Sequence, residues 1–473
     1  MPVGHNVCGD SVIKERVVFR FLDRIEERMR LEKLLSSSSG RFCCLYGRRR
    51  CGKTRLLEEC LKNRSDVLYY VADRTDRAAQ ISRFLKEAAV LNPAFGIAEC
   101  RNWSAVMDLW AVLAPRGAVL VFDEFPYLVE QDDALTSVLQ RIVDKLSDTG
   151  RKIIICGSSQ RMMQGFVLKA SEPLYGRAHE ILPIMPLTFE WMKAAFPEMS
   201  PWDRLKAWGV WGGVPRYWEL QDEEQDLWTA VRRNVTSPLG ILRNEPQFLL
   251  LDDVGDVAQA SAVMSFIGVG AHRAGEIAAR MQRPITDMSR PFQRLTELGL
   301  VTKDVPFGAD ANCKKSFYRI SDPFLDFWYA FVQPNLSNAG FLESRLERKS
   351  FDAVGYLPHL GGVWERLVRE EIQRRPLPGR GDCLQNAARW WGTGLDRRAM
   401  EIDVVAESLD GETLFVGEAK LSLSASDVEN TLAELEAKAR QLPFAHKYSR
   451  ITSTLFVARN PPPGAVSIDW LEG

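Results

Sequence analysis

The chain has 473 residues, 46% of them hydrophobic, and its 61 Lys and Arg almost balance its 62 Asp and Glu. This length predicts about three domains, and the hydrophobic content excludes a disordered scaffold. The near-neutral charge excludes a protein that is basic throughout, so any nucleic-acid surface must be local.

The number and spacing of the cysteines and histidines indicate the cellular compartment and whether a zinc cluster is expected. Nine cysteines, an odd number without a Cys-x-x-Cys pair, predict a reducing cytosol rather than a disulfide framework. The five histidines lie too far apart for a zinc cluster. No stretch approaches ~20 apolar residues and no export signal opens the chain, so we expect a cytoplasmic protein without a membrane partner.

The first domain is predicted over residues 20–186, after an irregular lead-in over 1–19. A charged helix near 23–35 and a polar loop over 36–40 precede a run in which strands alternate with helices. That alternation predicts the α/β class, a parallel sheet with helices on both faces. The strands are expected at 41–46, 66–71, 117–125, 152–156 and 180–184, and the helices at 53–62, 76–91 and 133–147.

Residues 47–54 are Gly-Arg-Arg-Arg-Cys-Gly-Lys-Thr, a full match to the phosphate-binding P-loop pattern between a strand and a helix. In this spacing the backbone N–H groups surround the phosphates, Lys53 reaches the β and γ oxygens, and the Thr54 hydroxyl binds Mg²⁺. We therefore expect ATP and Mg²⁺ as cofactors. The predicted contacts are Gly47, Arg48, Arg49, Arg50, Cys51, Gly52, Lys53, Thr54 and Arg55.

Two strands after the P-loop end in polar groups. Residues 118–122 are an apolar run that ends in Asp123 and Glu124, where an aspartate can hold Mg²⁺ and a glutamate can polarise the attacking water. The alternative for this pair is a helix cap. The next strand ends in Ser158 and Ser159, whose hydroxyls either sense the γ-phosphate or belong to a plain turn.

Two features lie further along the chain. Arg177, just before the fifth strand, is predicted to neutralise charge on the transferring phosphoryl group, in cis or across a subunit interface; the alternative is a surface arginine. Residues 187–250 are predicted to form a helical lid rich in Trp. Within it, Gly-Val-Pro at 213–215 either brings rigid backbone close to the nucleotide or breaks a helix.

The order of these motifs resembles that of the archaeal-type ATPases in the signal-transduction branch of AAA+-like P-loop proteins. The resemblance is carried by 21–24 (Phe-Leu-Asp-Arg), the P-loop, Asp123-Glu124, 157–159, 173–177 and 212–215. It implies that Asp23 and Arg24 flank the adenine and that Pro215 touches the nucleotide. It also implies that Ser158 or Ser159 is the first sensor, and that the protein is a switch with slow hydrolysis.

Residues 251–330 outline a winged helix-turn-helix, with helices predicted at 274–283 and 289–298 and a hairpin to Tyr318. Pro291 is tolerated only in a first turn, so the second helix is expected to begin at Ser289. Nine Lys and Arg against five Asp and Glu between 261 and 320 make the region locally basic, which predicts DNA contact. The alternative is a module that relays nucleotide state. The expected phosphate contacts are Arg290, Arg294, Lys314 and Lys315.

The last domain, residues 331–473, is predicted to mix helices with strands at 401–406, 413–418 and 452–458. Asp403 lies on the first of these strands, and Glu418-Ala-Lys420 ends the second, fifteen residues later. Two carboxylates at adjacent strand ends can bind Mg²⁺, which polarises a phosphodiester, while Lys420 stabilises charge or helps to activate water. The alternative is a β-hairpin with charged edges.

The aromatic stretch 317–329 is either a core connector or the junction it resembles, that of archaeal-type ATPases with a DUF234 domain. In those proteins the junction leads into a fold similar to restriction endonucleases. Asp403, Glu418 and Lys420 then match the PD-(D/E)xK nucleases, and the resemblance implies a supporting acid at Glu365. A degenerate copy of the fold that does not cut is the alternative.

Together these observations predict an ATP-binding, Mg²⁺-dependent ATPase switch that controls DNA engagement or cleavage by the C-terminal domain. The expected partners are ATP or ADP, DNA, and a second copy of the chain or another protein. The alternative from another class is a non-enzymatic regulator in which ATP occupancy gates binding of DNA or a protein. A helicase-like motor is disfavoured, because no translocation motif lies between the nucleotide core and the lid.

Overall fold

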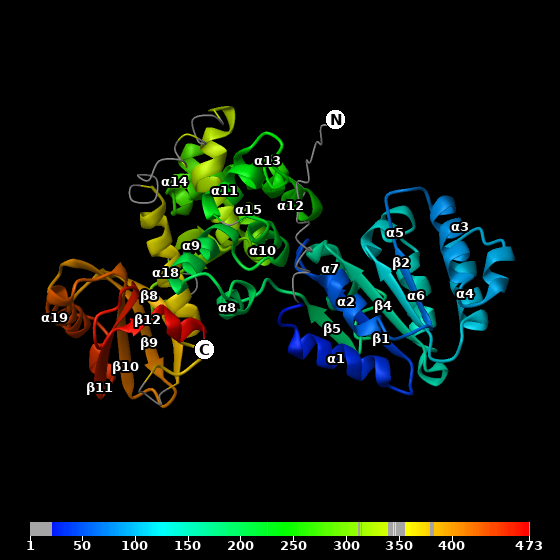
Figure 1. Cartoon of the computed structure of the whole chain (residues 1–473), viewed down its shortest axis with the longest axis horizontal. Helices are drawn as coiled ribbons and strands as arrows, with labels where there is room; N and C mark the ends of the chain where they lie inside the picture. Colours follow the sequence, from blue (N-terminus) through cyan, green and yellow to red (C-terminus); the bar gives the residue numbers. More distant parts are fainter. Residues whose placement is uncertain are drawn as a thin grey trace, which may run out of the picture.

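The structure is a computed structural model that describes residues 21–472 apart from 225, 255, 311, 312, 314, 339–343, 345, 347–354 and 379–382. The lead-in predicted over 1–19 and the predicted phosphate contact Lys314 lie outside the described residues. Figure 1 shows two lobes, an N-terminal one in blue to teal and a second one that holds the later helices and the C-terminal sheet. An extended segment next to the short helix α8 (Met192–Ala195) joins them.

The N-terminal sheet has five strands in the order β2-β3-β4-β1-β5, and every neighbouring pair is parallel. The strands are β1 (Arg41–Tyr46), β2 (Val67–Val71), β3 (Val119–Asp123), β4 (Lys152–Gly157) and β5 (Glu180–Pro183). The three central strands are buried almost throughout, because helices cover both faces of a parallel sheet. The predicted α/β class is confirmed.

Helices cover this sheet on both sides. Leu31 and Leu56 pack with Cys43 on one face, while Phe84 and Trp103 pack with Phe42 on the other. The helices are α1 (Ile25–Ser36), α2 (Lys53–Leu61), α3 (Arg77–Ala88), α4 (Trp103–Leu113), α5 (Phe125–Gln131), α6 (Leu135–Val143) and α7 (Gln160–Leu168). The sequence did not predict α4, α5 and α7; α5 has only 7 residues, and the apolar residues of α4 obscure its 3.6-residue period.

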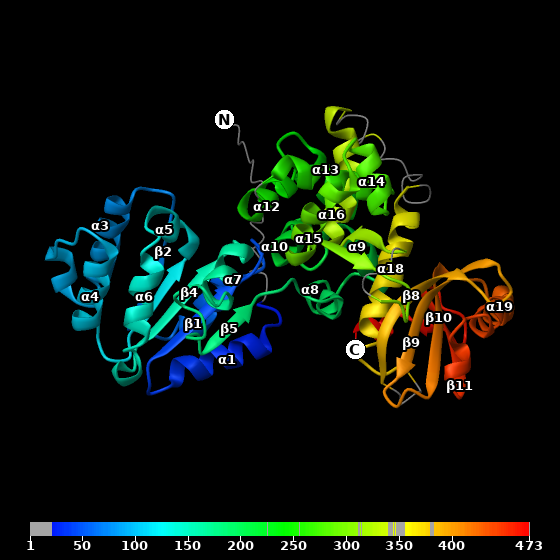
Figure 2. The same cartoon turned by 180° about the vertical axis from the view of Figure 1, so that it is seen from behind.

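The segment predicted as a lid is helical. Its helices are α9 (Pro201–Trp211), α10 (Pro215–Asp222), α11 (Leu227–Val231) and α12 (Glu245–Asp253). Prolines occupy the first turns of α9, α10 and α12, where the missing N–H costs no intrahelical bond. Since α12 contacts α7, this segment reaches back to the N-terminal lobe (Figure 2).

Three helices and a two-stranded antiparallel sheet follow over 257–320. They are α13 (Val257–Gly268), α14 (Ala274–Arg280), α15 (Ser289–Glu297), β6 (Val301–Asp304) and β7 (Phe317–Ile320). The third helix begins at Ser289, so Pro291 falls in its first turn as expected. The short helix α16 (Pro323–Phe327) comes directly after this module.

The C-terminal sheet has the order β12-β11-β10-β9-β8, antiparallel from β8 to β10 and parallel from β10 to β12. Leu360 and Trp364 of α18 cover one face, and Leu435 of α19 covers the other. The elements are α18 (Leu357–Glu371), β8 (Leu384–Thr393), β9 (Ala399–Ser408), β10 (Thr413–Ser422), α19 (Val428–Arg440), β11 (Arg450–Arg459) and β12 (Val466–Ser467). The sequence did not predict β8, whose pairing with β9 is interrupted by register shifts.

The helical segment and the C-terminal domain share one hydrophobic core. Gly209 of α9 lets the two approach closely, because a Cβ there would lie 2.5 Å from the Tyr356 hydroxyl oxygen. Arg204 and Glu472, 5% and 2% exposed in their side chains, form an ion pair across the same contact. Among the described helices, none is both long and apolar enough to cross a bilayer.

Candidate functional site

The P-loop runs from the end of β1 to the first turn of α2. A Cβ at Gly47 would lie 2.2 Å from the Ile184 carbonyl oxygen, so the loop can leave the sheet here only as glycine. Gly52 has φ +90°, a backbone conformation that residues with a side chain rarely adopt, and this lets the loop turn into α2. The loop therefore presents its backbone N–H groups at the N-terminus of α2, where the helix dipole favours an anion.

Lys53 is buried at this helix start, with 6% of its surface exposed. Its Nζ donates to the carbonyl oxygens of Gly47 at 2.8 Å and Arg48 at 3.1 Å. No described carboxylate forms an ion pair with it. Because a buried cation normally pairs with an anion, these residues fit the phosphates of a nucleotide.

The carboxylate of Asp123 is held at the end of β3, beside the P-loop. Its Oδ2 accepts from Thr54 Oγ1 at 3.0 Å and from the Tyr69 hydroxyl at 2.7 Å. Burial and the neighbouring Asp123 raise the pKa of Tyr69, so this phenol is a hydrogen-bond donor. A hydroxyl and a carboxylate within contact fit Mg²⁺, which prefers hard oxygen ligands. Tyr69 could not be predicted from the sequence, since its partner Asp123 lies on the adjacent strand β3.

Glu124 has a left-handed backbone with φ 53° at the N-terminus of α5. Its Oε2 accepts from the Ser158 backbone N–H at 3.3 Å and from Ser158 Oγ at 3.0 Å. Ser159 points elsewhere, because its Oγ donates to Asp253 Oδ1 in α12 at 2.9 Å. The two serines therefore differ: Ser158 contacts Glu124 beside the P-loop, and Ser159 contacts α12.

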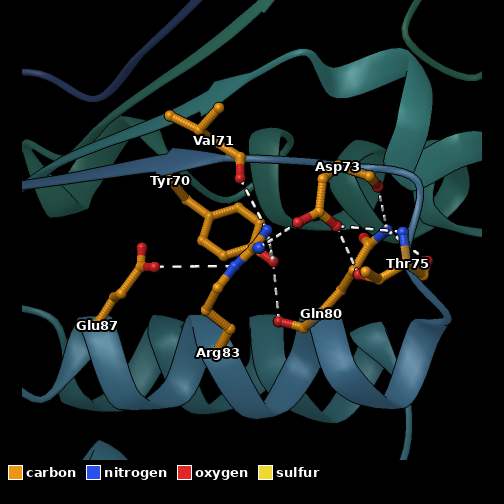
Figure 3. Close-up of polar contacts among 7 residues, drawn as sticks. All are labelled: Tyr70, Val71, Asp73, Thr75, Gln80, Arg83 and Glu87. Atoms are coloured by element: carbon orange, nitrogen blue, oxygen red, sulfur yellow. Dashed lines mark hydrogen bonds and ion pairs between the residues drawn. The ribbon is translucent and has the colours of Figure 1, made fainter.

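A polar cluster fixes strand β2, which carries Tyr69, at the edge of the sheet (Figure 3). Arg83 of α3 donates to the Val71 carbonyl at 2.8 Å and to the Tyr70 hydroxyl at 3.1 Å, and it also pairs with Asp73. Because neighbouring strand residues face opposite sides, Tyr70 meets α3 while Tyr69 meets Asp123. The cluster thus holds β2 in the register that Tyr69 requires.

A small cavity lies beside the P-loop, lined by Phe21, Leu22, Arg24, Cys51, Gly52, Arg55, Leu187 and Pro215. Arg24 closes one side by donating to the carbonyl oxygens of Cys51, at 3.1 Å, and of Met185. Asp23 is not among the lining residues, and burial raises its pKa. The lining is mostly apolar, as a flat aromatic base requires. The structure thus brings Arg24, Arg55 and Pro215 together next to the phosphate loop.

Arg177 lies at the N-terminal ends of the strands, whereas the P-loop lies at their C-terminal ends. Glu180, the first residue of β5, pairs with Cys43 near the start of β1, whereas the P-loop follows the end of β1. The six residues of β1 span roughly 20 Å, which exceeds the reach of an arginine. Arg177 Nε instead donates to Asp144 Oδ1 at 2.7 Å. The expected role in cis is therefore wrong for this arrangement; a role across a subunit interface stays a prediction.

A second constellation joins α18, β9 and β10 in the C-terminal domain. Asp403, 6% exposed, accepts the Ala419 N–H at Oδ2 at 3.0 Å. Lys420 Nζ donates to Glu418 Oε1 at 2.6 Å. Burial and the charges of Glu365 and Glu418 raise the pKa of Asp403 to about 6. The structure therefore brings all four predicted residues into one electrostatic site.

Sequence reasoning missed two basic residues at this site. Arg369 donates to the Asp403 carbonyl oxygen at 2.8 Å and lies 3.6 Å from Glu365 Oε2. Its signal was the i, i+4 spacing from Glu365 on one helix. Lys438 of α19 lies 3.9 Å from Glu418 Oε2 and had no local signal.

The carboxylates here fit a metal that is only partly held by protein. Within the described ranges, no three or more His, Cys, Asp or Glu side chains are arranged to hold an ion. Mg²⁺ typically takes one or two carboxylates and keeps its waters or binds substrate phosphates. Asp403 and Glu418 fit that arrangement.

The raised pKa of Asp403 predicts how metal binding at this site depends on pH. Below about 6 the carboxyl group is protonated and competes with the metal, so Mn²⁺ affinity should be roughly tenfold weaker at pH 5 than at pH 7. Calorimetric titration of the nucleotide-free protein would measure this. Asp403→Asn should abolish the difference, and equal affinities at both pH values in the wild type would contradict the assignment.

Two family models and one related protein match this chain. A family model described as an ATPase domain predominantly from Archaea matches residues 21–220, and DUF234, a model of archaeal and bacterial proteins of unknown function, matches 328–431. An uncharacterized protein of Methanocaldococcus jannaschii, MJECL04, is 30% identical over 431 residues, 89% of this chain and 92% of that protein.

Solved structures with a similar arrangement include two archaeal proteins. The Walker-type ATPase PABY2304 of Pyrococcus abyssi is 20% identical with a TM-score of 0.49, over 65% of this chain and 96% of that one. The Aeropyrum pernix ORC2 protein in its ADPNP–ADP complexes is 15% identical with a TM-score of 0.47, over 67% and 95%. The family matches and the 30% identical relative show that the chain belongs to the archaeal-type ATPases that carry a C-terminal DUF234 domain.

Proposed function

We propose that this ATPase is a Mg²⁺-dependent switch in which ATP binding and slow hydrolysis control DNA engagement or cleavage by the C-terminal domain. The observation that carries the proposal is the convergence of Glu365, Asp403, Glu418 and Lys420 from one helix and two strands. A raised carboxyl pKa beside a lysine is typical of a functional site rather than of a solvated hairpin.

In the ATPase site, the P-loop backbone and Lys53 would hold the phosphates of ATP, and Thr54 with Asp123 would hold Mg²⁺. Glu124, kept in place by Ser158, would accept a proton from the attacking water. The apolar cavity at Arg24 and Pro215 is only about 30 Å³ and would have to open before it could take the adenine. This assigns most of the P-loop surroundings to a single nucleotide.

In the C-terminal site, Asp403 and Glu418 would hold Mg²⁺, which when bound would polarise a phosphodiester and acidify a water. Lys420 would place its positive charge beside the oxygens of the phosphate under attack. Glu365 of α18, which lies 3.6 Å from Arg369, would add a third carboxylate to the charges around Asp403. The substrate class is therefore a nucleic-acid backbone.

The module over 257–320 would act as a winged helix that contacts DNA phosphates. Arg290 and Lys315 are exposed. Arg294 instead donates through Nε at 3.2 Å and through Nη2 to the Asp253 carbonyl oxygen. In this conformation, Arg294 would have to leave that carbonyl before it could contact DNA.

A non-cutting regulator is the second candidate. The observation that favours it is that both lysines near Glu418, and Arg369 beside Glu365, are engaged with carboxylates of the site itself. In such a protein the C-terminal domain would bind DNA or a protein without cutting, and ATP would gate that binding.

The deciding experiment is cleavage of labelled linear, supercoiled and single-stranded DNA, and of RNA, with Mg²⁺ or Mn²⁺ and with or without ATP. We expect metal-dependent cutting that ATP alters in the wild type but not in Lys53→Ala. If no substrate is cut but ATP changes DNA binding, the regulator is correct. If ATP changes neither cutting nor DNA binding, the proposed switch is wrong.

A further inference from the structure

The arginines of the P-loop connect it to three different parts of the molecule. Arg48 forms an ion pair with Asp322 and donates to the Tyr217 hydroxyl at 3.1 Å. Arg49 donates to the Tyr127 hydroxyl in α5 at 2.9 Å. Arg50 Nη2 lies 3.2 Å from Glu245 Oε2 in α12. The loop that wraps the phosphates is therefore tied to α5, to the lid and to the segment that starts the C-terminal half.

The contact of Arg48 with Asp322 is a buried ion pair between residues 274 positions apart, each side chain being 8% exposed. Removing one partner of such a pair leaves an uncompensated buried charge, so the two groups must move together or separate at a large cost. The Tyr217 hydroxyl extends the network by donating to Glu245 Oε1 at 2.9 Å. Arg48 and Arg50 thus reach the same lid carboxylate, one of them through Tyr217.

Asp322 lies in the short connection between β7 and α16. It follows β7 and caps α16, since its Oδ1 accepts the Leu325 N–H at 2.8 Å. Phe324 of α16 packs on Tyr217 with ring centroids 4.6 Å apart. One carboxylate therefore anchors the P-loop through one oxygen and sets the start of α16 through the other.

The connection between β7 and α16 also contacts α18, the helix that carries Glu365. Arg366 of α18 donates to the Ile320 carbonyl at 2.8 Å and to the Ser321 carbonyl at 3.3 Å. It also reaches Asp326 of α16 at 3.3 Å. Glu365 is the neighbouring residue, and Arg369, one turn on, holds the Asp403 carbonyl. Side-chain contacts, together with the backbone over 320–322 and the backbone of α18, hence connect the P-loop to the C-terminal carboxylates.

We propose that Asp322 is a positioning residue that couples nucleotide at the P-loop to the C-terminal site, through Arg48 on one side and Arg366 on the other. Because Arg48 shares its backbone with the phosphate-binding loop, rearrangement of that loop around phosphates moves the guanidinium and with it the start of α16. Coupling of this kind is reciprocal, so occupancy of the C-terminal site alters nucleotide affinity in turn. The inference rests on the proposed switch and names its route.

The test is hydrogen–deuterium exchange of the full chain with and without ADP, together with the affinity for fluorescent ADP. Asp322→Asn removes the charge and keeps an oxygen acceptor for the cap on α16. We expect ADP to change exchange in α16 and α18 of the wild type. In Asp322→Asn, ADP should still protect the P-loop and the response of α18 should be lost. The affinity for ADP should differ from that of the wild type, because the loop has lost its buried ion pair.

Glu472→Gln is the matched control, because it removes a buried, long-range ion pair with Arg204 that does not touch the P-loop. It should preserve the response of α18 to ADP even if the protein becomes less stable. An α18 response that is equal in wild type and Asp322→Asn would overturn the proposal, as would a response lost equally in Glu472→Gln.

Arg48→Gln provides a second test if Asp322→Asn does not fold. Glutamine removes the charge that pairs with Asp322, so loss of the α18 response is expected, and a full response would overturn the proposal. Exchange is read without nucleic acid. Absence of cleavage would therefore contradict only the nuclease part of the proposed function, whereas a wild-type α18 that ignores ADP would contradict this inference.

Discussion

Glu124→Gln is expected to lower the rate of ATP hydrolysis by about 10²- to 10⁴-fold while ATP binding is retained, because glutamine cannot accept a proton from water. The geometry lets this substitution remove the proton acceptor while the contacts with Ser158 are retained. Glutamine has the same length, and its amide oxygen can still accept from Ser158, which now donates to Glu124 through N–H and Oγ. Phosphate release under single-turnover conditions and equilibrium binding of labelled ATP measure the two quantities.

Glu130→Gln is the matched control for this prediction. Glu130 lies on the same helix α5, is 37% exposed in its side chain, and its carboxylate lies 3.6 Å from Arg74 rather than at the P-loop. Its substitution should leave hydrolysis within a factor of about two, as expected for an exposed ion pair. An ATP lifetime that is equally long in the wild type and in Glu124→Gln would instead support the non-enzymatic regulator.

Lys420→Ala is expected to lower metal-dependent cleavage by about 10²- to 10³-fold, the usual loss when one preorganised charge at a transition state is removed. Lys420 Nζ is 2.6 Å from Glu418 Oε1 and shares the field of Asp403 and Glu365, so its charge is held at the site. Cleavage of the best DNA or RNA substrate in Mn²⁺ should be compared with ATP hydrolysis, which the substitution should not change.

Lys438→Ala tests whether the effect belongs to the motif lysine or to positive charge in general. Lys438 approaches the same carboxylate, at 3.9 Å from Glu418 Oε2, but comes from α19 outside the motif. It should reduce cleavage only severalfold. Similar losses in both variants would indicate a general electrostatic role, and cleavage unaffected by Lys420→Ala would show that any cutting arises elsewhere.

Several features of this protein could be predicted because their chemistry is local in the chain. The P-loop needs only a strand, a glycine-bounded loop and a helix in succession, and residues 41–61 supply all three. Asp123 and Glu124 end a strand of a parallel sheet, so they were expected at the edge where the P-loop lies. Asp403 and Lys420 were found by a spacing that spans two consecutive strands.

Other expectations failed where the pattern carried no signal. Two tryptophans stand side by side in β8, and the strand's register with β9 shifts at Ala388, so its alternation is irregular. Arg177 was placed at the ATPase site from its motif alone. Its place at the N-terminal ends of the strands follows from the pairing of β5 with β1, and that pairing is a property of the folded sheet.

The phosphate-binding loop and the Asp123-Glu124 pair could be predicted because each depends on residues within a few positions of one another. The α/β class could be predicted because strands alternate with helices along the chain. The contact between Arg48 and Asp322 across 274 residues, and the different partners of Ser158 and Ser159, became visible in the folded chain. Glu365 was named from the resemblance, and the structure shows that α18 brings its charge close to Asp403. Such long-range contacts depend on how elements pack, and the local periodicity of a chain does not record its distant neighbours.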